Sequence, residues 1–201
     1  MKRKYLNTKQ TLALVCTALF LMFATSAFAF HSDGKCRSCH TPHNALDVQI
    51  PLWGYVPPTP GAYIQYTSDT INATMGDPNG ISKMCMGCHN TAVTPTGKGI
   101  GLDMRRTHPV SFTYDAALAA ADGGLWDPEV TPSGIGQRGV LGLGTISHDM
   151  LRGTDHNQIE CVSCHEPHDK YGFGKGSGGD SLAYLVMDNT AGQLCKTCHK
   201  K

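Results

Sequence analysis

The sequence predicts a mostly irregular, loop-rich chain with short α-helices, and three features of its composition support this. Gly and Pro supply 23 and 11 of the 201 residues, which disfavours long helices and regular sheets. Aromatic residues make up only 7% of the chain, so they contribute little to a conventional hydrophobic core. Cys and His are numerous, at nine and ten. We therefore expect the chain to wrap around something that cysteine and histidine side chains bind.

The N-terminal residues 1–29 have the features of a secretory signal peptide. Three basic residues, Lys2 to Lys4, precede an apolar stretch at 11–23, and Ala27 and Ala29 form a small-x-small cleavage site. Cleavage there predicts an exported mature chain of residues 30–201, in the periplasm or at the cell surface, that lacks Cys16. The alternative is an uncleaved membrane anchor, because residues 11–30 are almost long enough to span a bilayer.

The eight remaining cysteines all belong to one motif, Cys-x-x-Cys-His, which occurs four times. This is the attachment signature of c-type haem. Cysteines at i and i+3 project from one face of a helical turn, so both sulfurs can reach the same porphyrin. The adjacent His is then placed as the proximal iron ligand. The predicted attachment residues are Cys36, Cys39, Cys85, Cys88, Cys161, Cys164, Cys195 and Cys198, and the predicted proximal ligands are His40, His89, His165 and His199.

Four covalently bound haem c groups therefore explain the composition, since flat apolar porphyrins would form much of the core. Three other uses of the cysteines compete with this interpretation: four disulfides, zinc sites and redox-active dithiols. None of the three requires a His after each second Cys.

An internal repeat divides the mature chain. His31-x4-Cys36-x-x-Cys39-His40-x-Pro-His43 matches the segment from His156 to His168, and each copy is followed by one plain Cys-x-x-Cys-His. We predict haem-pair units at about 30–89 and 156–199, joined by a loop-rich linker at 90–155. Short helices are expected around each motif and at 115–121, with Asp115 as the N-terminal cap and Gly123 as the stop.

Six further histidines could supply the second axial ligand of each iron. With histidines in excess of the four that are needed, every haem could be bis-His, which suits electron transfer rather than substrate chemistry. Three residues cannot wrap round a porphyrin, so His43 and His168 should ligate haems other than those of their own motifs. The repeat makes His31 and His156 equivalent. The six are His31, His43, His108, His148, His156 and His168.

The chain resembles the doubled Cys-x-x-Cys-His family of multihaem cytochromes c. The resemblance rests on Cys-His-Thr-Pro-His-Asn-Ala from Cys39, on Pro51-Leu52-Trp53, on the segment 66–70, on His108-Pro109-Val110 and on the other motifs. It implies a fold wrapped around four haems. It also implies His31, His43, His108 and His168 as distal ligands, whereas the repeat favours His156 over His108. His148 and His156 remain the alternative distal ligands.

The start of the mature chain, Phe30-His31-Ser32, is also similar to outer-surface cytochromes that polymerise into haem filaments. That resemblance implies that His43 could ligate a haem in a neighbouring subunit and so link copies of this chain.

These features favour a tetrahaem electron carrier or conduit with low-potential bis-His haems, rather than an enzyme. Its partners would be redox proteins such as other cytochromes. Nucleic acid is not expected as a partner, because 17 Lys and Arg are balanced by 16 Asp and Glu. Membrane attachment requires that the N-terminal segment is retained. Two alternatives are a membrane-anchored quinol dehydrogenase and a small multihaem reductase with an open iron position.

Overall fold

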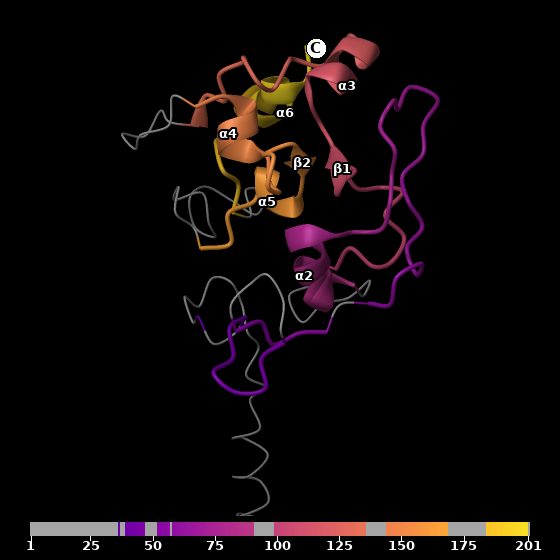
Figure 1. Ribbon diagram of the computed structural model, residues 1–201, viewed down its shortest axis with the longest axis vertical. Helices are drawn as coiled ribbons and strands as arrows, with labels where there is room; N and C mark the ends of the chain where they lie inside the picture. Colours follow the sequence, from indigo (N-terminus) through magenta and orange to yellow (C-terminus); the bar gives the residue numbers. More distant parts are fainter. Residues whose placement is uncertain are drawn as a thin grey trace, which may run out of the picture.

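The computed structural model describes residues 36, 39–46, 52–56, 58–90, 99–135, 144–168 and 184–200. The predicted signal peptide and His31 lie outside these residues. Within them the chain is loop-rich, with short helices and a two-residue strand pair, as the composition predicts (Figure 1). No helix among the described residues has the length and apolar character needed to cross a membrane. The elements are α2 (Gly80–His89), β1 (Phe112–Thr113), α3 (Ala116–Asp122), α4 (Ile146–Met150), β2 (Gln158–Ile159), α5 (Cys161–Cys164), the 3₁₀ turn η4 (Thr190–Gly192) and α6 (Gln193–Cys198).

Helix α3 begins and ends where the sequence predicts. The Asp115 carboxylate accepts a hydrogen bond from the backbone nitrogen of Leu118 at 2.8 Å, which satisfies a free donor of the first turn. The run of alanines between the caps has the highest helix propensity. Gly123 ends the helix with a left-handed φ of 71°, and its N–H donates to the carbonyl of Ala119.

Strands β1 and β2 join the predicted linker to the predicted second haem-pair unit. They pair antiparallel, with Phe112 opposite Ile159 and Thr113 opposite Gln158. The pairing continues on both sides, because the N–H groups of Ser111 and Tyr114 donate to the carbonyls of Ile159 and Asn157. This contact brings residues 111–114 directly onto the segment that leads into the third motif.

A side-chain core does form, and most of it comes from the predicted linker. Its buried members lie on β1, α3, α4, β2 and α6 or beside them, in the upper part of Figure 1. The expectation that porphyrins fill the interior is therefore incomplete for this region, where residues 110–135 and 146–151 supply conventional apolar packing. The cluster consists of Tyr114, Ala119, Ile146, Met150, Leu151, Ile159, Val186 and Leu194.

Helix α2 lies between the first motif and the second unit. On one side α2 contacts α5. On the other side it meets Tyr55 so closely that a β-carbon on Gly87 would lie 2.9 Å from the Tyr55 β-carbon. A glycine at this position of the second motif therefore allows residues 52–56 to approach the helix.

Candidate functional site

The Cys-x-x-Cys-His motifs share one local conformation. The N–H of His40 donates to the carbonyl of Cys36 at 2.8 Å, and the equivalent bonds of His165 and His199 are both 3.0 Å. The second motif lies at the end of α2. Each motif is therefore a helical turn that carries its two cysteines on one face, which confirms the prediction from their spacing. None of the eight motif cysteines forms a disulfide in the structure.

The backbone of each predicted proximal histidine is held by a distant segment. His40 forms a bridge with Trp53, His165 with Leu185 and His199 with Leu125. The carbonyl of His89 instead accepts from the N–H groups of residues 100 and 101, both at 3.1 Å. Tertiary hydrogen bonds therefore hold the backbone from which each imidazole projects.

Two of these histidines face a histidine from elsewhere in the chain. The rings of His40 and His168 have their centres 6.5 Å apart with planes at 11°, and those of His108 and His199 are 6.3 Å apart at 72°. Two imidazoles that bind one metal ion from opposite sides, through bonds of about 2 Å, have ring centres roughly 6 Å apart. Both pairs therefore have a ring separation that would suit two ligands of a single iron.

A hydrogen bond at Nδ1 holds the ring of each of the two partner histidines. Nδ1 of His168 donates to Glu166 Oε1 at 2.9 Å, and Nδ1 of His108 donates to the carbonyl of Pro109 at 2.8 Å. Such a bond fixes the ring and leaves Nε2 as the metal-binding nitrogen, the arrangement usual for histidine ligands. His168 and His108 thus combine a fixed Nδ1 with a second histidine at ligand spacing.

The other candidate distal ligands are placed differently. His43 is exposed. His148 and His156 pair with each other, with ring centres 6.3 Å apart and planes at 11°. The structure thus brings His40 to His168 and His199 to His108.

The thiols show the order in which the four motifs adjoin. Cys85 donates a hydrogen bond to Cys161, which raises the pKa of Cys85 and lowers the pKa of Cys161. Burial, and then the nearby Cys39 thiol, raises the pKa of Cys88. Burial, and then Cys195, raises the pKa of Cys164 to about 11. The first motif therefore adjoins the second, the second adjoins the third, and the third adjoins the fourth.

Most of these pKa shifts argue against the alternative in which the Cys-x-x-Cys pairs act as redox-active dithiols. The reactive form of cysteine is the thiolate, which a raised pKa makes scarce at neutral pH. Burial is the largest cause of the raised pKa of Cys39 and of Cys198, the latter reaching about 12.

The zinc alternative needs a cluster of ligands. The part of the chain that the structure describes contains no group of three or more Cys, His, Asp or Glu placed to hold a metal ion.

A buried carboxylate joins the second motif to the third. Glu160, only 2% exposed, directly precedes Cys161, and its Oε2 accepts from the Ser82 backbone nitrogen at 2.9 Å and from the Ser111 hydroxyl at 3.3 Å. In return the Ser82 hydroxyl accepts from the Cys161 backbone nitrogen at 2.8 Å. Burial raises the pKa of Glu160, and its hydrogen bonds partly offset this rise. The network fixes α2 against α5.

The residues around His40 and His168 fit a large prosthetic group with a polar edge. The Trp53 ring lies edge-on to His40, with the centres 6.3 Å apart. Trp53 is 9% exposed, and its buried Nε1 has no hydrogen-bond partner in the structure. A buried indole N–H without a partner is costly. A haem held by Cys36, Cys39 and His40 would offer carboxylate acceptors, so the donor set here suits haem.

Sequence reasoning missed the residues that orient the histidines and join the helices. Glu166 lies two residues before His168, and Glu160 directly precedes a motif, so their positions in the sequence were visible. The signal in each case is an isolated carboxylate beside a motif. Only the fold shows that Glu160 is buried against Ser82 and that Glu166 contacts an imidazole nitrogen of His168.

Comparison with known proteins gives one informative similarity. No family model matches the chain. The chain is 28% identical over 191 residues to the C-type cytochrome OmcS of Geobacter sulfurreducens, and the match covers 78% of this chain and 38% of OmcS. The chain thus spans well under half the length of that relative. The similarity supports a c-type cytochrome, the class of protein that the four Cys-x-x-Cys-His motifs predict.

Proposed function

We propose that the chain is an exported tetrahaem c-type cytochrome that transfers electrons through bis-His haems and is not an enzyme. The observation that carries this proposal is the pairing of His40 with His168 and of His199 with His108 at ligand spacing. A bound haem would supply a one-electron iron couple whose potential the axial ligands and burial adjust. Bis-His ligation would give the low potentials expected of such a carrier.

The chain's own residues would hold the four groups in a series. Each pair of motif cysteines would form the two thioether bonds, and the histidine that follows would bind iron. Because Cys85 contacts Cys161, and because Cys164 lies near Cys195, the attachment points follow one another through the protein. Electron transfer depends on short distances between neighbouring centres, so a series of adjoining sites supports a carrier or conduit.

The first test is the mass and the low-temperature EPR spectrum of protein made in a host that matures cytochromes. We expect the mass of residues 30–201 plus four haems, and low-spin ferric signals. Retained residues 1–29 would favour the membrane-anchored quinol dehydrogenase. A high-spin haem in the wild-type protein would favour the reductase. Colourless protein would contradict the proposal itself.

The angles between the planes of the paired imidazoles make the EPR test more specific. Imidazole planes are nearly parallel in the His40–His168 pair, at 11°, and nearly perpendicular in the His108–His199 pair, at 72°. Parallel planes give a rhombic low-spin ferric signal, whereas perpendicular planes give a signal with a large maximal g value. His168→Ala should remove a rhombic signal and His108→Ala a large-g signal, each with the appearance of one high-spin haem. If either variant leaves all four haems low-spin, the assignment of that histidine is wrong.

The internal repeat also favours a second property, namely that copies of the chain bind to one another. His168 reaches from the second unit to a histidine of the first unit. His43 occupies the equivalent position in the first unit and is exposed. By the same relationship, His43 would ligate an iron in a second copy and so form a homopolymer at the cell surface. His43→Ala should then yield only single chains in mass photometry, where the wild type forms polymers.

A further inference from the structure

Glu160 is a buried carboxylate that no cation balances. It is 2% exposed, and among the described residues no Lys, Arg or His forms an ion pair with it, including Lys83 on α2. Its Oε2 accepts hydrogen bonds from the Ser82 backbone nitrogen and from the Ser111 hydroxyl, and both of these donors are neutral. Burial accordingly raises the pKa of the Glu160 carboxyl group. The protonation of a carboxyl group in such a place responds strongly to any other charge that changes nearby.

Glu160 lies where the second motif adjoins the third. It directly precedes Cys161 at the start of α5, and the Cys85 thiol of α2 is hydrogen-bonded to Cys161. From α2 and α5, the titratable groups that face Glu160 are these two thiols. Attachment of haem would convert both thiols into thioethers, which do not titrate. In the haem-loaded protein, the charges beside Glu160 that can still change are therefore those of the second and third haems.

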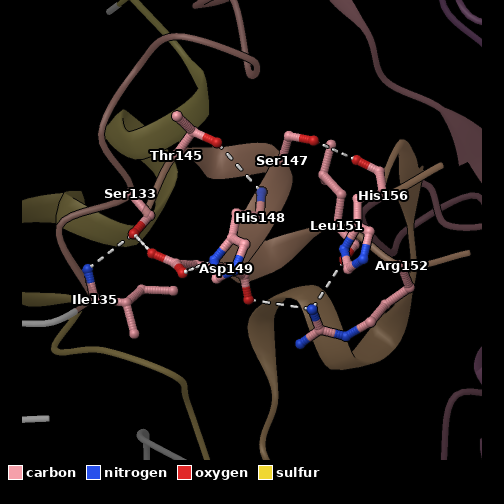
Figure 2. A network of polar contacts seen from close by, with 9 residues as sticks. All are labelled: Ser133, Ile135, Thr145, Ser147, His148, Asp149, Leu151, Arg152 and His156. Atoms are coloured by element: carbon pink, nitrogen blue, oxygen red, sulfur yellow. Dashed lines mark hydrogen bonds and ion pairs between the residues drawn. The ribbon is translucent and has the colours of Figure 1, made fainter. Parts of the chain in front are cut away.

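The charged groups of the other elements packed here have partners of their own. Strands β1 and β2 contain no ionisable residue. Helix α4 contacts α5, but its Asp149 carboxylate accepts from the Ser133 hydroxyl and, at 2.7 Å, from His148 Nδ1 (Figure 2). The guanidinium of Arg152, which follows α4, donates to three backbone carbonyls at 3.0–3.1 Å. These contacts pair the charges of α4 and Arg152 with groups other than the Glu160 carboxylate.

Ser111 connects the buried carboxylate with the surface. Its hydroxyl lies 3.3 Å from Glu160 Oε2 and accepts from the Asn79 backbone nitrogen at 2.9 Å. Asn79 is exposed. Because a hydroxyl both donates and accepts hydrogen bonds, Ser111 can pass a proton between solvent and Glu160.

We propose, on the basis of the tetrahaem function proposed above, that Glu160 binds a proton when the second or third haem is reduced and releases it when that haem is oxidised. An electron from a one-electron donor protein converts ferric to ferrous iron, and a proton from solvent forms an O–H bond on the Glu160 carboxylate, so the net charge of the region is unchanged. Oxidation by the next acceptor reverses both changes. Because such coupling is reciprocal, protonation of Glu160 favours the ferrous state, and the reduction potential falls as the pH rises.

The first measurement is a redox titration of the haem-loaded protein, followed by EPR, at pH values from about 5 to about 8. The second and third haems are those whose signals survive in both His168→Ala and His108→Ala. We expect their potentials to fall as the pH rises, by at most about 59 mV per pH unit, the limit for one proton per electron. Glu160→Gln, which cannot bind the proton, should lose this dependence. Glu129→Gln, which changes an exposed carboxylate, is the matched control and should behave as the wild type does.

The second measurement is the infrared difference spectrum between electrochemically reduced and oxidised protein. We expect reduction to add the C=O band of a protonated carboxyl group, and Glu160→Gln to lack this band. Ser111→Ala keeps the carboxyl group but removes a hydrogen bond that lowers its pKa, so this variant should shift the band and move the pH-dependent range upward. It also decides the matter if Glu160→Gln does not fold.

Two outcomes would overturn the proposal. The first is an unchanged pH dependence in Glu160→Gln, which would assign the proton to the haem carboxylates. The second is a reduction-induced band that neither Glu160→Gln nor Ser111→Ala alters, or the absence of such a band from the wild type. A mass with fewer than four haems would instead contradict the proposed function, while the Glu160 band would still report on a haem at the second or third motif.

Discussion

Glu160 Oε2 lies 2.9 Å from the backbone nitrogen of Ser82, so the carboxylate that precedes α5 caps the first turn of α2. Asn79, the residue before α2, makes no side-chain cap of its own. The α2 N-terminus carries partial positive charge and unpaired N–H groups, which favour an anion there. One side chain thus stabilises the helix of the second motif and holds it against the third.

Replacing Glu160 should separate its two roles as hydrogen-bond acceptor and as charge. Glu160→Ala leaves the Ser82 N–H without an acceptor and leaves the Ser111 hydroxyl only its longer bond to the Asn79 carbonyl, so it should lower the free energy of unfolding by about 3 kcal/mol. Glu160→Gln keeps one acceptor oxygen and should cost about 1 kcal/mol. Guanidinium unfolding followed by circular dichroism measures both. The exposed Glu129→Ala is the control, expected within about 0.5 kcal/mol of wild type. Equal costs at Glu160 and Glu129 would show that the network contributes nothing.

Burial raises the pKa of Glu160 above its ordinary 4.5, so this side chain should make stability depend on pH. The folded state then holds the proton at a pH at which the unfolded chain has released it. By linkage, the contribution of Glu160 to stability falls as the pH rises from 4.5 through the raised pKa. We expect the stability of the wild type relative to Glu160→Gln to increase when the pH is lowered from 7 to 4.5. A constant difference across that range would contradict the raised pKa.

Gly80 should not tolerate a side chain, because of its backbone conformation and because Glu160 lies close to it. A comparison of Gly80→Ala with Gly61→Ala can separate these two causes. Its φ is 48°, and a β-carbon there would lie 2.7 Å from Glu160 Oε1. Gly61 also has a positive φ, of 82°, but nothing lies within 4 Å of its β-carbon position. Gly61→Ala should cost about 1–2 kcal/mol for the backbone alone. Gly80→Ala should cost a further 1–3 kcal/mol or so, because it also crowds the carboxylate. Equal unfolding midpoints for the two variants would exclude the close contact.

Gly87→Ala should loosen the first motif from the second. The added β-carbon would approach the Tyr55 β-carbon to 2.9 Å, so residues 52–56 must move away from α2. We expect faster amide hydrogen exchange in residues 39–46 and 52–56. Gly76→Ala, where nothing lies within 4 Å, should leave that exchange unchanged. Unchanged exchange in Gly87→Ala would mean that the helix absorbs the methyl group itself.

Glu166→Gln should raise the reduction potential of one haem. The Glu166 carboxylate accepts from His168 Nδ1 at 2.9 Å and so makes the imidazole a stronger donor to ferric iron. A neutral amide accepts less strongly, so the ferric state loses stabilisation and the potential rises. A redox titration that follows the rhombic EPR signal measures this change, with Glu129→Gln as the control. An unshifted potential would indicate that His168 binds no iron.

The local features of this protein were predictable from the sequence because they depend on neighbouring residues. The Cys-x-x-Cys-His spacing places two thiols and an imidazole on one helical turn wherever it occurs. Asp115 and Gly123 bound α3 through hydrogen bonds to residues three or four positions away. The abundance of Gly and Pro likewise predicted short elements and many loops.

The pairings between distant segments were decided only by the tertiary structure. His168 meets His40, and His108 meets His199, across more than ninety residues in each case, and several histidines met the same sequence criteria. From the sequence, the family resemblance favoured His108 and the internal repeat favoured His156, and the prediction was His108; only the fold sets His108 beside His199. The role of Glu160 has the same origin, because a carboxylate acquires its burial and its partners only when α2 packs on α5. Spacing along the chain determines which groups are available, whereas loop closure and packing determine which of them meet.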